Sequence, residues 1–109
     1  MNIKFDYDGV EYTLEYSKQA VRMMENQGFS VEKLSAKPAT TIPVLFKGAF
    51  YMHHKDMKVK KIDEIYSALE NKADLIYALT ELYMDAVNSV LEGDSPEDGS
   101  KKVKWTKNE

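Results

Sequence analysis

The chain has no cysteine, and only three prolines and five glycines among its 109 residues. The absence of cysteine excludes disulfide bonds and thiolate metal sites, and it suits a reducing compartment. Few prolines and glycines leave long uninterrupted stretches in which helices form. The chain has the usual length of one domain. Its 43% hydrophobic residues, with seven Tyr, four Phe and one Trp, are enough to fill a core.

Long apolar runs and an excess of one charge are also missing. No segment approaches the roughly 18 apolar residues of a membrane span. The N-terminal MNIKFDYDG lacks the apolar run of a signal peptide. The net charge is −3, from 15 basic and 18 acidic residues spread along the chain, without the basic stripe that binds nucleic acid. We therefore expect a cytoplasmic protein that binds neither membranes nor nucleic acid.

The first clear pattern is a β-hairpin over residues 2–16. Two runs of alternating apolar and polar residues are separated by Asp8-Gly9, a strong signal for a two-residue type I′ turn. The expected register pairs Tyr7 with Val10, Phe5 with Tyr12 and Ile3 with Leu14. This register places all the apolar residues on one face, which must then pack on helices.

Helical periodicity dominates the rest of the chain. The stretch from Thr40 to His54 is apolar around most of its circumference, which predicts a buried central helix capped by Thr40 or Thr41, with Pro43 in its first turn. Helices are expected over residues 18–27, 31–35, 41–54, 58–71 and 74–92. Expected helix-end signals are an N-cap at Ser17, a left-handed Gly28 with a Schellman contact from Phe29, and an N-cap at Asp74.

These elements predict an α+β fold that is mainly α. The hairpin packs on a bundle of four to five helices in a single domain, residues 1–92, and residues 93–109 form a disordered charged tail. Only two or three residues separate the last two helices, which predicts an antiparallel αα-hairpin.

Catalytic, cofactor and metal sites are not expected. His53 and His54 are adjacent, so on a helix they point about 100° apart and cannot share one ion. We interpret them as histidines favoured by the negative end of a helix. Gly48 is interpreted as a close packing contact with a neighbouring helix. The lysines between residues 55 and 61 are interpreted as a solvated face, and no serine has a histidine suitably placed for catalysis.

Several residues are candidates for protein contacts. The apolar stripe of the last helix is broader than a two-helix contact requires. We expect Tyr77, Tyr83 and Val87, or the edge formed by Met23 and Met24, to lie partly exposed and to contact an oligomer or a client. Trp105 lies in a basic segment, where it is either an interface anchor or part of an inert tail. The methionines suit either the core or an adaptable groove.

Three stretches resemble a family of small proteins encoded in tail-gene clusters of phages and prophages of Gram-positive bacteria. They are FDYDG, the E-x-x-G-F pattern at Glu25–Phe29, and the PxLFxGAFxxHHK run from Pro43 to Lys55. The resemblance covers roughly residues 3–92 and transfers no catalytic residue.

Proteins of this size in that setting are similar to tail assembly chaperones. The resemblance implies a mainly helical, non-enzymatic protein of the host bacterial cytoplasm. It would coat the tape-measure protein before the major tail protein polymerises around it, self-associate, and be absent from the mature virion. A longer frameshifted form that recruits the major tail protein is common among such chaperones. The alternatives are a structural tail component or head–tail connector retained in the virion, and a small phage-encoded interaction protein.

Overall fold

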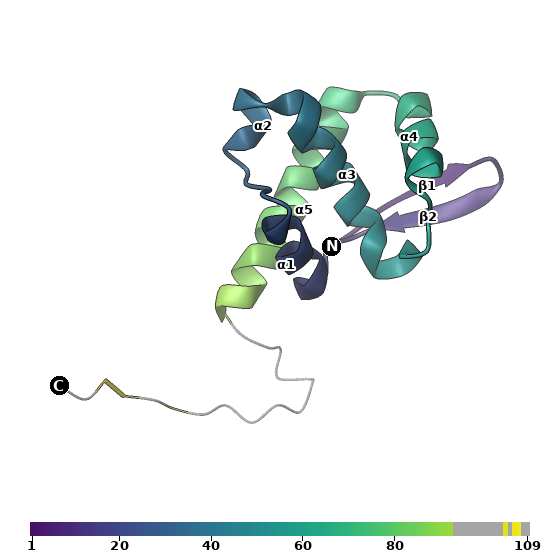
Figure 1. Ribbon diagram of the computed structural model, residues 1–109. Coiled ribbons are helices and arrows are strands. Elements are labelled where there is room, and N and C mark those ends of the chain that lie inside the picture. The colour runs from purple at the N-terminus through teal and green to yellow at the C-terminus, as the bar shows by residue number, and fades with distance from the viewer. Residues whose placement is uncertain (93–103, 105, 108–109) are drawn as a thin grey trace.

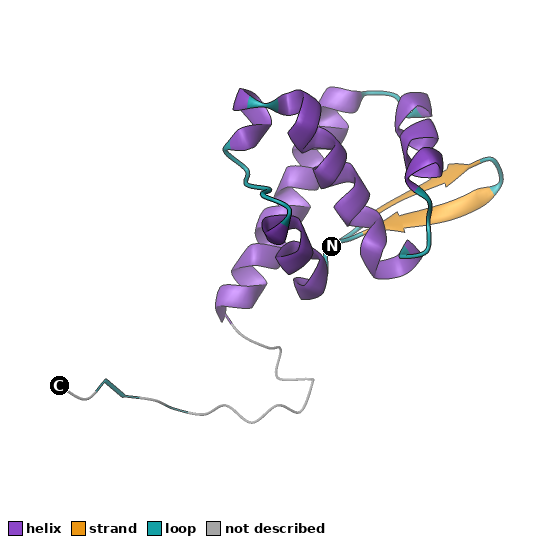
Figure 2. Ribbon diagram, in the orientation of Figure 1, coloured by secondary structure: helices purple, strands orange, loops and turns teal. Residues whose placement is uncertain are grey.

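A computed structural model describes residues 1–92, 104 and 106–107 of the chain (Figure 1). An antiparallel hairpin is followed by five helices, as the α+β prediction requires (Figure 2). The elements are β1 (Ile3–Tyr7), β2 (Val10–Leu14), α1 (Lys18–Asn26), α2 (Lys33–Ala36), α3 (Pro38–His54), α4 (Val59–Ala68) and α5 (Lys72–Glu92). The predicted disorder of residues 93–109 falls almost wholly outside the described residues. Within those residues, no helix has the length and apolarity that a bilayer span requires.

The hairpin has the predicted register, including the pair of Tyr7 with Val10 at its turn. Asp8 and Gly9 both have positive φ, 53° and 80°, as a type I′ turn demands. The apolar face is buried at the base of the hairpin, whereas Val10 is exposed at the turn. The turn projects past the helices in Figure 1, although Tyr7, the last residue of β1, still packs against the core.

Helix α1 has both predicted end signals, although it ends at Asn26, one residue before the predicted end. The Ser17 hydroxyl accepts a hydrogen bond from the N–H of Ala20 at 3.1 Å. At the other end Gly28 has a φ of 87°, and the N–H of Phe29 donates to the carbonyl of Met24 at 3.0 Å. This Schellman closure reverses the chain, and the Phe29 ring is buried in the core.

Helix α3 is the central element that the sequence predicts, because it contacts β2 and every other helix. It begins at Pro38, three residues before the predicted start, so the predicted caps at Thr40 and Thr41 are wrong. Proline suits the first helical position, since its φ is already helical and its missing N–H has no partner there. Pro43 consequently lies inside the helix rather than in its first turn.

Gly48 permits the close approach of α1 to α3. A Cβ atom at this position would overlap the side chain of Met24, which is buried. The predicted packing contact at Gly48 is therefore confirmed, and it explains why Met24 is enclosed.

The remaining helices differ from their predicted bounds. Helix α2 begins two residues late, α4 is shorter at both ends, and α5 begins at Lys72, so Asp74 lies in its first turn and is not the N-cap. The predicted αα-hairpin is wrong as well, because α4 packs mainly on α3. Leu69 is extended and Asn71 has a φ of 53°, so the connection carries α5 onto α3 and α1 instead.

Polar contacts fix the segment after β2 to one side of α3. The N–H of Glu15 donates to the carbonyl of Ala49 at 3.0 Å, and the Tyr16 hydroxyl donates to the carbonyl of Leu45 at 2.6 Å. Because Leu45 and Ala49 are four residues apart, both bonds fall on one face of α3. The hairpin is thus joined to the helices by directional bonds as well as by apolar packing.

Candidate protein-binding site

Helix α5 has two apolar faces. Leu79, Leu82 and Tyr83 are buried against the rest of the domain. On another side of the same helix Tyr77 is 71% exposed and Leu91 is 80% exposed. One face therefore builds the core, and the other is left to solvent.

The exposed face has the spacing of a coiled-coil seam. Its residues follow one another at alternating intervals of four and three, the pattern that presents one continuous line to a partner helix. All are half-buried or exposed. We call this set the outer stripe: Ala73, Tyr77, Thr80, Met84, Val87 and Leu91.

A row of acidic side chains borders the outer stripe. Asp74, Glu81 and Asp85 are separated by seven and four residues, which places them on one line along the helix. Each follows a residue of the outer stripe, so the row lies along one edge of it, and all three residues are exposed. We call these three residues the acidic row.

The surface beside the outer stripe is hollowed. One hollow of about 510 Å³ is lined by stripe residues, two residues of the acidic row and the N-terminal methionine. Its lining consists of Met1, Ala73, Ile76, Tyr77, Thr80, Glu81, Met84 and Asp85. The hollow is therefore lined mainly by apolar side chains, together with the acidic Glu81 and Asp85.

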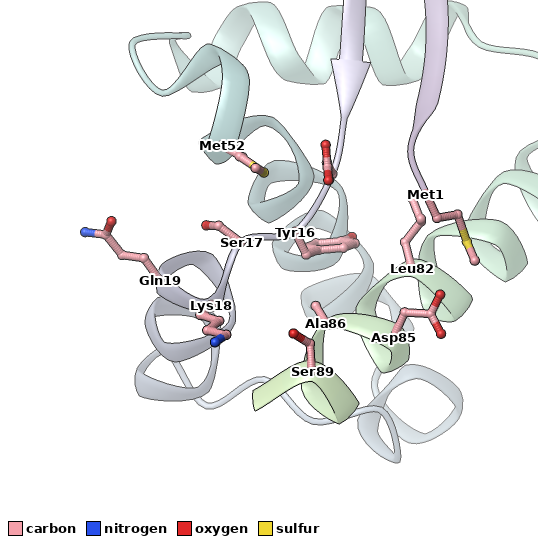
Figure 3. Close-up of a pocket in the computed structure, with 11 residues that line it drawn as sticks. Met1, Tyr16, Ser17, Lys18, Gln19, Met52, Leu82, Asp85, Ala86 and Ser89 are labelled. Atoms are coloured by element: carbon pink, nitrogen blue, oxygen red, sulfur yellow. The ribbon is translucent and has the colours of Figure 1, made fainter. Parts of the chain in front are cut away.

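A second hollow of about 600 Å³ adjoins the first, since Met1 and Asp85 line both (Figure 3). In Figure 3 Tyr16 lies between Ser17, the residue that caps α1, and Leu82 of α5. The hydroxyls of Tyr16 and Ser17 are engaged in the structural hydrogen bonds described above. Burial, and then the neighbouring Tyr83, holds the pKa of Tyr16 well above its ordinary value, so this phenol stays neutral.

The structure exposes some of the residues predicted to contact a partner and buries others. Tyr77 is exposed, and Val87 and Met23 are half-buried, as expected. The expected exposure of Tyr83 and Met24 is wrong, because both side chains are buried.

The reason for the burial of Tyr83 is aromatic packing. Its ring lies 4.8 Å from that of Phe29 and 5.6 Å from that of Tyr16, both edge-to-face. Trp105 lies outside the described residues. The exposure of Met84 and Leu91 was missed by sequence reasoning, although Tyr77, Met84 and Leu91 follow one another at intervals of seven residues, a signal that could have found them.

The two histidines serve structural contacts. His53 Nε2 lies 2.9 Å from a carboxylate oxygen of Glu15, whereas His54 Nε2 accepts a hydrogen bond from the N–H of Thr13 at 3.0 Å. The two rings thus contact different partners, Thr13 in β2 and Glu15 just after this strand. No three His, Cys, Asp or Glu residues in the described part of the chain are grouped to hold a metal ion.

Acidification is expected to weaken the fold through His54. Burial, and then repulsion from His53, lowers the pKa of His54 below its ordinary value near 6.5. The unfolded chain therefore binds this proton at a higher pH than the folded chain, and the free energy of unfolding falls as the pH drops below about 6.5. Protonation would also remove the acceptor for Thr13, so the loss is on the order of 1 kcal/mol.

Urea denaturation of the wild type and of His54→Gln at about pH 7.5 and about pH 5.5 measures this effect. The wild type should lose more stability between the two pH values than the variant loses. An equal loss in both proteins would show that His54 is not the group responsible.

Comparison with curated proteins finds no match, and comparison with solved structures finds none either. A family model, described as a domain of unknown function (DUF5055), matches residues 1–108. This match spans nearly the whole chain and therefore includes the hairpin, the helices and the outer stripe. The chain belongs to the DUF5055 family.

Proposed function

We propose that this protein is a non-enzymatic tail assembly chaperone, which binds the tape-measure protein of a phage during tail morphogenesis. The observation that carries the proposal is the exposed outer stripe of α5. The resemblance over residues 3–92 supplies the biological setting.

The outer stripe suits a chaperone that holds a long amphipathic helical protein. From Ala73 to Leu91 it extends about 27 Å along α5, at 1.5 Å per residue. A client helix laid along it would bury apolar side chains of both partners between two helices, without requiring an enclosed pocket. Separate sites of this length on many copies could cover an extended client in succession.

The proposal is tested by co-expression with the tape-measure protein encoded nearby, followed by size-exclusion chromatography with light scattering. A soluble complex with several copies per tape-measure chain is expected. Tyr77→Asp should abolish it while the variant keeps the circular dichroism of the wild type. The matched control is Val59→Asp on α4, where the valine is 49% exposed but lies outside the outer stripe.

If the protein elutes alone and the tape measure stays insoluble, the chaperone proposal is wrong. Mass spectrometry of purified particles separates the chaperone from the structural alternatives independently. A chaperone leaves the assembled tail and should be absent from mature virions, whereas a structural tail component or connector would be present in stoichiometric amounts.

A further inference from the structure

We propose that the segment bound by the outer stripe is an amphipathic helix with lysine or arginine along one edge of its apolar face. The inference rests on the proposed function in one respect, namely that the outer stripe is the client surface. It adds the chemistry by which that surface selects its client. Charge complementarity and helical spacing carry it.

The charge of α5 is of one sign. Between Ala73 and Glu92 the helix has four acidic residues and no basic residue. Lys72, at its start, directs its ammonium group away, since Nζ donates to the carbonyl of Leu69 at 2.8 Å and lies 5.5 Å from the centre of the Tyr66 ring. The acidic row therefore faces the partner's edge without a cation from its own helix to neutralise it.

The residue spacing of the outer stripe predicts that the partner is a helix. The outer stripe repeats with the heptad pattern, into which the side chains of another helix fit as knobs into holes. In such a pair, residues at the edges of the apolar seam lie opposite one another and determine which partner is accepted. A partner with cations along the facing edge would meet Asp74, Glu81 and Asp85 in turn.

The same charges disfavour a second copy of this chain. In an antiparallel pair of α5 helices, the matching edges of the two helices meet, so the acidic rows would face each other. In a parallel pair, each acidic row would instead lie against the opposite edge of the partner's outer stripe. That edge is the one along which the partner's α5 packs on its own core. A cationic helix meets neither obstacle.

Synthetic helices provide the test on the full chain. Three fluorescent peptides share one composition of apolar residues. The first has them in heptads with lysine at the edges, the second has glutamate in place of lysine, and the third is a scrambled version of the first. Fluorescence anisotropy should show the lysine peptide binding about tenfold tighter than the glutamate peptide at about 0.05 M salt, as three exposed ion pairs would give. The preference should shrink at about 0.5 M salt because of screening.

Two isosteric variants locate the effect. Glu81→Gln with Asp85→Asn removes charge from the acidic row without changing side-chain volume, and it should remove most of the preference for lysine. The control is Glu70→Gln, an exposed acid outside α5, which should leave the preference unchanged.

Equal binding of the lysine and glutamate peptides would overturn the inference, as would equal binding of the scrambled peptide, which would indicate unspecific attraction. Sedimentation that showed a dimer broken by Tyr77→Asp would make a second copy the occupant of the stripe and would also overturn it. If the peptides behave as expected but the tape measure does not bind, the proposed function fails and the charge selectivity of the stripe stands.

Discussion

Tyr83→Asp is expected to unfold the domain, whereas Tyr77→Asp on the same helix is expected to leave it folded. Tyr83 is only 3% exposed, and its ring packs edge-to-face on Phe29 and Tyr16. Removing a buried aromatic side chain costs about 3–5 kcal/mol. The new carboxyl group would also be buried without a charged partner. A loss of at least about 4 kcal/mol is a large part of the 5–15 kcal/mol that typically stabilise a domain.

Thermal and urea denaturation followed by circular dichroism measure the difference between the two variants. Tyr77 is 71% exposed, so its replacement should change the free energy of unfolding by less than about 0.5 kcal/mol. Tyr83→Phe keeps the ring and should remain folded. A Tyr83→Asp protein that melted like the wild type would contradict the packing of α5 described above.

This contrast decides which residue can be varied to test the proposed client binding. A variant at Tyr83 that lost client binding would report only the loss of the fold. A variant at Tyr77 alters the outer stripe while α5 stays packed, so its binding defect would be specific to the surface.

The parts of the fold that local chemistry determines could be predicted from the sequence. The Asp8-Gly9 turn fixes the hairpin register, because only one pairing places both residues at positive φ and the apolar residues on one face. Ser17 and Gly28 likewise mark the ends of α1 through hydrogen bonds made within a few residues. No distant contact is needed for either prediction.

The exposure of residues on α5 could not be predicted in the same way. The helix is apolar over more than one face, so periodicity identifies a helix without saying which face meets the core. Tyr77 and Tyr83 are the same residue type on one helix, and only the packing of Tyr83 on Tyr16 and Phe29 separates them. The docking of α4 on α3 rather than α5 depends on the connection at Leu69 and Asn71, whose conformation the periodic pattern does not specify.

A chain of aromatic contacts links the hairpin to the helices. Phe5 stacks on Tyr12 with ring centres 5.5 Å apart, and Tyr12 meets Phe50 of α3 at 6.1 Å. Phe50 packs on Phe46 at 5.0 Å, and Phe46 packs on Tyr66 of α4 at 5.1 Å. Phe50 therefore occupies the middle of the chain, and it is 1% exposed.

Phe50→Ala should lower the free energy of unfolding by about 3–5 kcal/mol, because it removes a buried ring and leaves a cavity. In a domain of this size the melting temperature should fall by more than about 10 °C. Met52→Ala, on the exposed side of α3, is the control and should have little effect. Since a hairpin alone is marginally stable in water, loss of Phe50 should also speed amide hydrogen exchange in β1 and β2 more than in α5. Unchanged exchange in the strands would mean that the polar bonds to α3, rather than the aromatic chain, hold the hairpin in place.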